Sequence, residues 1–116
     1  MHITRAQDAK PYQAPGHHNM TMHRIQGQDV TPLHNVWSAR LAMGPNGHVE
    51  AKASPAGKLY IVVEGHVRFR GGDTTVDLQA GDSVFVLPNE VRAFSEAAGA
   101  HALLYLVMLE HYEAPQ

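Results

Sequence analysis

Histidines are the first residues in this sequence whose type suggests chemistry. Nine occur among 116 residues, and histidine both titrates near neutral pH and binds metals. Their spacing is unhelpful, because only His17 and His18 are close neighbours. A metal site built from His18, His23 and His48 is one alternative, and solvent-exposed histidines are the other. The absence of cysteine excludes disulfides, thiolate catalysis and cysteine-ligated zinc.

Short strands must position these residues, because no helical periodicity persists along the chain. Segments rich in Val, Leu, Phe and Tyr recur at short intervals and are separated by Gly, Pro, Asn and Asp, a pattern typical of a β-sandwich or β-barrel. The cluster Gly44–Gly47 is expected to form a turn between two strands. The strands are expected at Met20–Ile25, Val36–Met43, Val49–Ala53, Lys58–Val63, His66–Arg70, Thr74–Leu78, Ser83–Leu87, Arg92–Ser95 and Ala102–Leu109.

The length fits one domain, for which we expect an extended N-terminal arm (1–19), a barrel (20–110) and a short tail (111–116). The formal net charge of −2 gives no reason to expect nucleic acid or an acidic membrane as a partner. No secretory signal or membrane-length apolar run is present, so the expected location is cytoplasmic. Ala102–Leu109 is apolar on both faces, which predicts a homodimer.

Two stretches carry a family resemblance. Lys58–Gly65 ends in Glu64-Gly65, and Gly81–Pro88 is followed by Asn89. The first stretch resembles the end of the first sequence motif of the cupin superfamily, and the second stretch resembles the opening of the second motif. The resemblance implies an all-β fold, a single cupin barrel of the double-stranded β-helix or jelly-roll type.

The metal ligands of that family do not carry over. The position of the family's Glu ligand is Lys58, and that of its last His is Arg92. Its first two His positions fall on Ala51 and Ala53, or on Lys52 and Ser54 if the spacing is one residue shorter. Protonated Lys and Arg cannot ligate a divalent cation, and their charge repels it. We therefore expect no metal and no cofactor at this position, with relocated histidine ligands as the alternative.

The resemblance instead implies a pocket for an anion. Alternation along the strand places Lys58 and Tyr60 on one face, and Arg92 would converge on the same cavity. Such a pocket suits a small organic carboxylate, and a Lys with a lowered pKa can serve as base or amine nucleophile in lyase or isomerase chemistry. The expected catalytic residues are Lys58, Arg92, Tyr60 and His18, and the expected ligand contacts are Arg92, Lys58, Glu50, Ala51, Ala53 and His17.

Two other readings stay open at this point. Lys58 and Arg92 could form structural ion pairs with Glu50 or Glu96, because a buried charge needs a partner. The same pocket could also serve a binding module or sensor without turnover.

Overall fold

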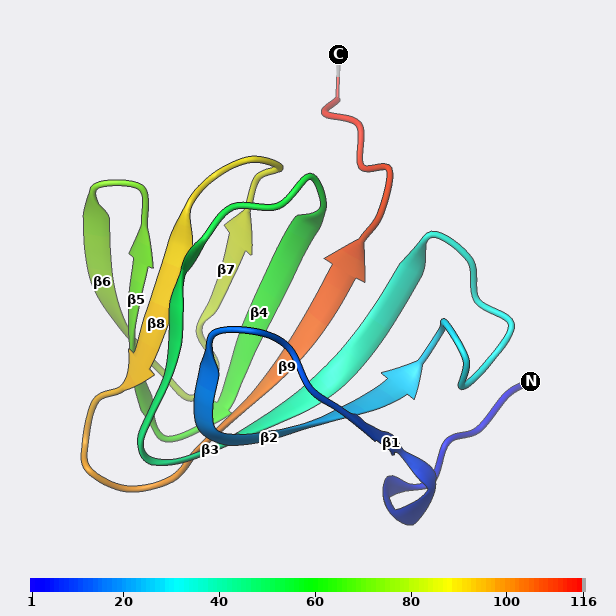
Figure 1. The fold of residues 1–116 in the computed structure, drawn as a ribbon, viewed down its shortest axis with the longest axis horizontal. Helices are drawn as coiled ribbons and strands as arrows, with labels where there is room; N and C mark the ends of the chain where they lie inside the picture. Colours follow the sequence, from blue (N-terminus) through cyan, green and yellow to red (C-terminus); the bar gives the residue numbers. More distant parts are fainter. Residues whose placement is uncertain (116) are drawn as a thin grey trace.

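Antiparallel strands make up almost all of the molecule. The computed structural model describes residues 1–115. Within them, nine strands form one sheet that curls into a nearly closed barrel (Figure 1). Along the sheet the order is β6-β5-β8-β3-β9-β4-β7, with β2 on β3 and β1 on β2. The strands are β1 (Lys10–Tyr12), β2 (His17–Gln26), β3 (Val36–Lys52), β4 (Gly57–Glu64), β5 (His66–Gly71), β6 (Thr74–Gln79), β7 (Ser83–Val86), β8 (Arg92–Glu96) and β9 (Ala102–Leu109), preceded by the 3-10 turn η1 (Ala6–Asp8).

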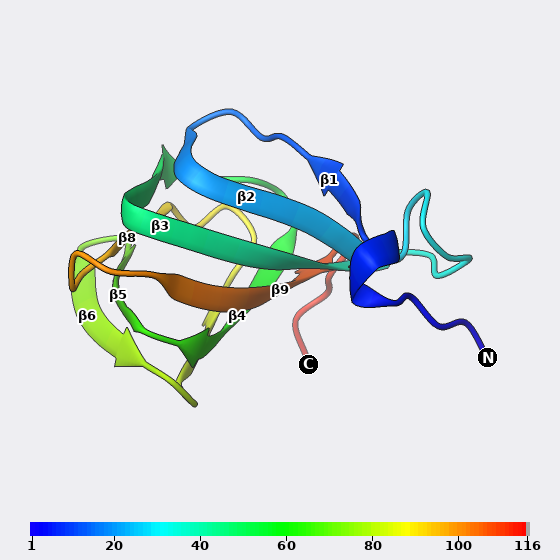
Figure 2. The same cartoon turned by 90° about the horizontal axis from the view of Figure 1, so that it is seen from below.

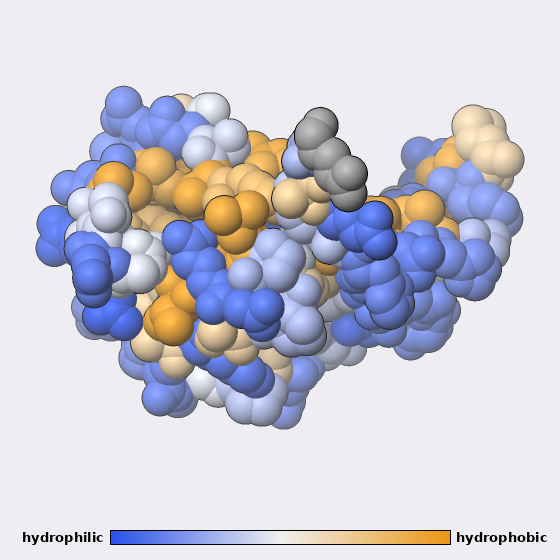
Figure 3. Space-filling model, turned by 90° about the horizontal axis from the view of Figure 1, so that it is seen from above, coloured by the Kyte–Doolittle hydropathy of each residue, from blue (hydrophilic) through white to orange (hydrophobic). Residues whose placement is uncertain are grey.

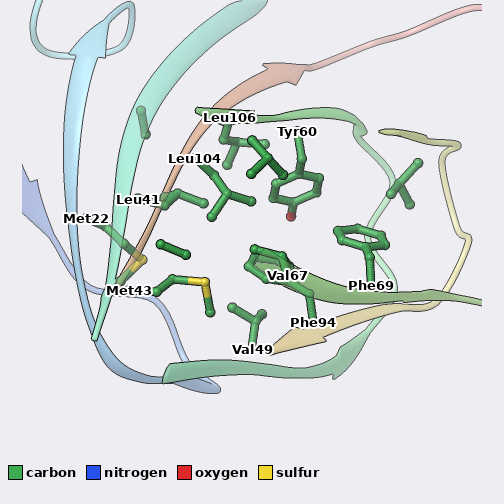
Figure 4. Packing of buried hydrophobic residues seen from close by; sticks show 14 residues of the cluster. Met22, Leu41, Met43, Val49, Tyr60, Val67, Phe69, Phe94, Leu104 and Leu106 are labelled. Atoms are coloured by element: carbon green, nitrogen blue, oxygen red, sulfur yellow. The ribbon is translucent and has the colours of Figure 1, made fainter. Parts of the chain in front are cut away.

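The core lies inside the barrel and follows the alternation of the strands. In β4 the buried residues Lys58, Tyr60 and Val62 alternate with less buried ones, as the period of two requires. Figure 4 shows the side chains of the core converging from several strands, with the Tyr60 hydroxyl directed into the interior. The Tyr60 ring packs against Phe69 and Phe94 at centroid distances of 5.3 and 5.1 Å. The aromatic cluster of Tyr60, Phe69 and Phe94 therefore fixes the position of the Tyr60 ring.

One expected turn is absent. Gly44–Gly47 lies inside the continuous strand β3, so the predicted division into Val36–Met43 and Val49–Ala53 is wrong. A Cβ on Gly47 would lie 2.8 Å from the Asn19 carbonyl oxygen, and the β2–β3 register shifts between His18 and Met20. The glycines thus permit a bulge and a close approach of two strands rather than a chain reversal.

The N-terminal segment extends the sheet. β1 pairs with β2, with Lys10 opposite Arg24 and Tyr12 opposite Met22. Figure 2 shows β1 and the loop after it lying beside β2. His17 and His18 already belong to β2, so the barrel's own strands begin before residue 20. Residues 10–16, which we call the arm, return to the barrel at Gly16, whose carbonyl accepts the Glu50 N–H at 2.8 Å.

Apolar surface gathers at the end of the barrel from which the C-terminal segment leaves, where it is orange in Figure 3. Exposed apolar side chains there include Phe85, Leu87 and Val91, from β7 and the loop that follows it. Within residues 1–115, no helix has the length and apolar character needed to cross a membrane.

Candidate functional site

A cavity of about 280 Å³ opens at the barrel end where β3 and β9 finish and β4 and β8 begin. Lys58 is the second residue of β4, Arg92 the first of β8, and Lys52 the last of β3. Pairing of Lys52 with Arg92 holds two of these strand ends together. Antiparallel topology therefore gathers three cationic side chains at one mouth.

Arg92 is fixed on two sides and free on a third. It is 6% exposed, its Nε donates to the Tyr60 hydroxyl at 3.0 Å, and its Nη1 donates to the Glu50 carbonyl oxygen at 3.0 Å. Within the described chain Nη2 donates to no protein group, so one arm of the guanidinium fork is available to a ligand. A fork held in this way is suited to a carboxylate.

Lys58 is buried without a partner. It is 3% exposed, and Nζ forms no hydrogen bond to any described residue. Burial, followed by the charges of Arg92 and Lys52, lowers the pKa of Lys58 below its ordinary value. The expected structural ion pair with Glu50 or Glu96 is absent from residues 1–115. Lys58 is thus an amine whose neutral form is favoured by its surroundings.

Unpaired polar atoms are concentrated at this cavity. Within residues 1–115, three buried side-chain atoms lack a hydrogen-bond partner: Arg24 Nε, Ser54 Oγ and Lys58 Nζ. All three residues line the cavity. An unsatisfied buried polar group costs free energy, and the three residues that carry one come together at this cavity.

The opposite wall of the cavity is aromatic. Tyr12 from the arm and Trp37 from β3 meet edge to face at 5.7 Å. The Arg24 guanidinium lies over both rings, at 4.6 and 4.7 Å from their centroids, and its Nη1 lies 3.4 Å from Asp29. Burial raises the pKa of Tyr12 to about 12 despite the opposing effect of Arg24. Together with Leu106 and Met108, these rings offer an apolar surface to the uncharged part of a ligand.

The two adjacent histidines have different surroundings. His17 lines the cavity, and burial chiefly lowers its pKa. Its Nδ1 lies 3.0 Å from the Pro15 carbonyl, which can only accept, so Nδ1 carries the proton and Nε2 is a free acceptor. His18 instead binds the exposed Glu50 carboxylate at 2.7 Å and stacks on His48. Of the pair, His17 is the one that faces the cavity.

The residues predicted from the sequence fall into two groups, those that line the cavity and those that do not. Lys58, Tyr60, Arg92 and His17 all line the cavity, whereas His18 does not. Glu50 contributes its backbone carbonyl through Arg92, while its side chain is turned outward to His18.

Ala51 and Ala53 are exposed and do not line the cavity, whereas Lys52 and Ser54 do. The register of β3 against β8 shifts between Val49 and Lys52, and such a bulge re-aims the side chains that follow. The shorter of the two motif spacings is therefore the one that the structure adopts.

Sequence reasoning missed Arg24, Tyr12 and Trp37 as cavity residues. Their placement depends on the pairing of β1 with β2 and of β2 with β3, and no local sequence motif predicts that pairing. The one local feature that could have drawn attention to the arm is Tyr12, an aromatic residue next to Pro11.

The donor set does not fit a divalent metal. Apart from His17, the residues Lys52, Ser54, Lys58 and Arg92 provide at this mouth one hydroxyl, two amines and a guanidinium, and no carboxylate or second imidazole of the kind that divalent metals prefer. Nor do the histidines form a site elsewhere: among residues 1–115 no three His, Asp or Glu side chains are grouped so as to hold a metal ion.

Comparison with known proteins identifies the family. Residues 39–109 match the cupin domain family. The chain is 30% identical over 113 residues to "Beta-D-galactosidase Rv1717" of Mycobacterium tuberculosis, covering 96% of this chain and 95% of that protein.

Solved structures show the same fold at low identity. An RmlC-like cupin from Shewanella frigidimarina has a TM-score of 0.80 at 16% identity, covering 97% of this chain and 94% of its own. The polyketide cyclase RemF from Streptomyces resistomycificus also has a TM-score of 0.80 at 16% identity, with coverage of 98% and 87%. With its all-β barrel and a domain match over more than half of its length, this chain belongs to the cupin family.

Proposed function

We propose that this cupin binds a small carboxylate-bearing organic metabolite in the barrel mouth without a metal ion. The observation that carries the proposal is the set of three unpaired polar atoms on Arg24, Ser54 and Lys58. The residues that carry these atoms line a cavity that also contains Lys52 and Arg92 and, among residues 1–115, no Asp or Glu. A ligand carboxylate supplies both the missing charge and the missing acceptors.

The residues suggest a division of labour. The free Nη2 of Arg92, with Lys52 nearby, holds the carboxylate, while the apolar wall receives the rest of the molecule. Lys58 and His17 both have lowered pKa values, chiefly because of burial. The surroundings of each therefore favour its neutral form, which is the form that can accept a proton. Proton transfer of the lyase or isomerase kind is the chemistry that this arrangement favours.

Calorimetric titration with matched ligands tests the binding. Phenyllactate is the anionic probe, and its methyl ester is the neutral control of nearly the same shape. We expect the acid to bind and the ester to bind at least tenfold more weakly. Arg92→Ala should abolish the preference, whereas Arg68→Ala, at an exposed arginine paired with Asp77, should preserve it. Equal binding of acid and ester by the wild-type protein would overturn the proposal.

The name of the mycobacterial relative supports a second candidate, a β-galactoside in the same cavity. Tyr12 and Trp37 provide aromatic surface of the kind that can pack against a sugar ring. However, most glycoside hydrolases use two carboxylates, and none lines this cavity among residues 1–115. Hydrolysis of a nitrophenyl β-galactoside that is lost in Lys58→Met but retained in Lys10→Met would favour this candidate. Absence of hydrolysis together with acid binding would favour the first.

A binding module without turnover would use the same contacts. Incubation of the protein with a bound acid, followed by NMR of the ligand, separates the two classes. Conversion or hydrogen–deuterium exchange of the ligand indicates an enzyme, and an unchanged ligand indicates a binding protein.

We also infer that the partner of this chain is a second copy. Leu59 and Ile61 of β4 lie beside Val107 and Tyr105 of β9 in register, and all four are only half-buried. They form a contiguous apolar area on the outside of the barrel, of the kind that protein contacts cover. Light scattering should give about twice the chain mass of 12.7 kDa, and Tyr105→Arg should halve it.

A further inference from the structure

We propose that Lys58 forms an imine with the carbonyl carbon of a 2-oxo acid whose side chain is apolar or aromatic. This inference rests on the proposed carboxylate site and names the substrate class that the site would take. Lys58 is 3% exposed, its Nζ has no partner in the described chain, and it faces a cavity that also presents Arg92. An unpaired buried amine beside a carboxylate receptor is placed to meet the carbonyl group adjacent to a bound carboxylate.

The geometry separates the two tasks of binding and attack. Arg92 is anchored by Tyr60 and the Glu50 carbonyl, so it presents Nη2 in a fixed direction. Lys58 and Tyr60 lie on the same face of β4, two residues apart. In a 2-oxo acid the carbonyl carbon is directly bonded to the carboxylate carbon. A carboxylate held at Arg92 therefore brings the electrophilic carbon to the wall that carries Lys58.

The charges also favour attack by the free amine. Burial, followed by the nearby cations Arg92 and Lys52, favours the neutral form of Lys58, and only the neutral amine is nucleophilic. No Asp or Glu of residues 1–115 lines the cavity to hold an ammonium ion in place. A lysine serving only as a fixed positive charge would gain from such a carboxylate, whereas a nucleophilic lysine is weakened by one.

The reaction balances without a further reactant. The lone pair of Nζ forms a bond to the carbonyl carbon, and one N–H proton moves to the carbonyl oxygen to give a carbinolamine. The C–O bond then breaks, the hydroxyl leaves as water after taking up a proton, and the nitrogen lone pair forms the C=N bond. Overall, the amine, the ketone and one proton give a protonated imine and water.

Tyr60 is the group positioned to supply that proton. Burial chiefly raises its pKa, although Arg92 opposes the shift, so its hydroxyl remains protonated at neutral pH. Its oxygen accepts from Arg92 Nε at 3.0 Å, which leaves its own proton to donate. The protonated imine then draws electrons from the neighbouring carbon, whose proton Nε2 of His17 can accept, and this links the imine to lyase or isomerase chemistry.

Reductive trapping tests the inference directly. The full-length protein is incubated with phenylpyruvate and cyanoborohydride, and intact mass and peptide maps are recorded. We expect one adduct per chain, with the mass of the acid less one oxygen atom, located on Lys58. The chain has only three lysines, and exposed Lys10, which does not line the cavity, serves as the internal reference within the same protein. Lys10→Arg should be trapped as efficiently as the wild type, and Lys58→Met should not be trapped.

The outcomes separate this inference from the one on which it rests. Adduct on Lys58 in at least tenfold excess over Lys10 supports the imine, and the peptide map gives this result even if Lys58→Met fails to fold. Binding of phenyllactate and phenylpyruvate with no adduct on Lys58 overturns the imine and leaves the carboxylate site standing. No binding of either acid overturns the carboxylate site, and adduct spread evenly over the three lysines overturns the imine.

Discussion

The two ends of this barrel each bury an ionisable side chain, Glu96 at one and Lys58 at the other, and the two differ in their hydrogen bonding. Glu96, at the end of β8, is 7% exposed. Its Oε1 accepts the Ala98 N–H, and its Oε2 accepts the Ala100 N–H at 3.1 Å. Lys58, at the other end of the barrel, is 3% exposed and has no hydrogen-bond partner among residues 1–115. Burial is similar in the two regions, but hydrogen-bond satisfaction is not.

The difference separates a structural charge from a candidate functional one. Burial opposes ionisation of Glu96, but hydrogen bonds from backbone N–H groups outweigh it and lower the pKa of the carboxyl. Those bonds hold the turn between β8 and β9. At the mouth, the pKa of Lys58 is lowered by burial and by like charges. No hydrogen bond from the described chain offsets this effect. Of these two buried groups, the one without a hydrogen-bond partner is the one whose residue lines the cavity.

Removing Lys58 or Arg92 from the mouth should have the largest effect. In Lys58→Met and in Arg92→Ala, binding of phenyllactate should weaken by about 10- to 100-fold, because the first loses the Nζ hydrogen bond to the ligand and the second loses the guanidinium that holds the carboxylate. Calorimetry measures the change. Glu96→Gln provides the matched control from the other region and should bind as the wild type does. A loss of binding in Glu96→Gln equal to that in Lys58→Met would remove the distinction between the two regions.

Stability should change in opposite directions in the two regions. Lys58→Met replaces an unpaired amine by an apolar side chain of similar length, so we expect the free energy of unfolding to rise by about 1–3 kcal/mol. Urea denaturation measures it. A decrease of that size would mean that Lys58 has a structural partner.

Glu96→Ala should instead destabilise the barrel. The substitution leaves the N–H groups of Ala98 and Ala100 without their acceptor, so we expect Tm to fall by about 4 °C or more. Differential scanning calorimetry measures the shift. An unchanged Tm would show that the turn between β8 and β9 does not depend on this carboxylate.

The smallest effects should lie in the pH dependence of stability. Glu96 should contribute to it at acid pH and Lys58 at alkaline pH. Unfolded Glu keeps its proton up to about pH 4.3, whereas Glu96 in the folded barrel loses it at a lower pH. The unfolded state therefore binds more protons there, and the contribution of Glu96 is lost as the pH falls through its folded pKa. Unfolded Lys keeps its proton to about pH 10.4, whereas folded Lys58 loses it earlier, so stability should rise with pH between those values.

Difference curves isolate each window. The wild type minus Lys58→Met should show the alkaline rise, and the wild type minus Glu96→Gln the acid loss. Denaturation at a series of pH values up to about 9, where most tyrosines are still protonated, provides both. A flat difference curve for Lys58→Met would indicate that the folded barrel does not lower the pKa of Lys58 into this range.

Motif spacing and strand alternation could predict the barrel and part of the mouth. The stretches that end at Gly65 and begin at Gly81 locate β4 and β7, and these two glycines have positive φ of 85° and 96°. Alternation along β4 placed Lys58 beside Tyr60, which the structure confirms. Regular elements with a period of two leave little freedom, because a one-residue slip would expose the core.

The rest depended on non-local geometry. The bulge between Val49 and Lys52 decides whether Ala51 or Lys52 faces the mouth, and a bulge is set by the partner strand rather than by its own residues. Arg24 reaches the cavity because its guanidinium packs over the rings of Tyr12 from β1 and Trp37 from β3. The contrast between His17 and His18 likewise arises from the path of the arm, through the Pro15 carbonyl and the Glu50 carboxylate.

The arm has a consequence for how such a barrel could acquire new specificities. Tyr12, Gln13, Ala14 and Pro15 all line the cavity, yet only Tyr12 among them lies in a strand, the short outer strand β1. Replacing these four residues would alter the shape of the mouth while leaving β3, β4, β8 and β9 and their cations in place. Under the proposed function, the groups that would hold the anion lie on the barrel strands, whereas part of the surface that would contact the rest of the ligand lies on this arm. The same frame could be retargeted to larger or smaller acids by exchanging one short segment.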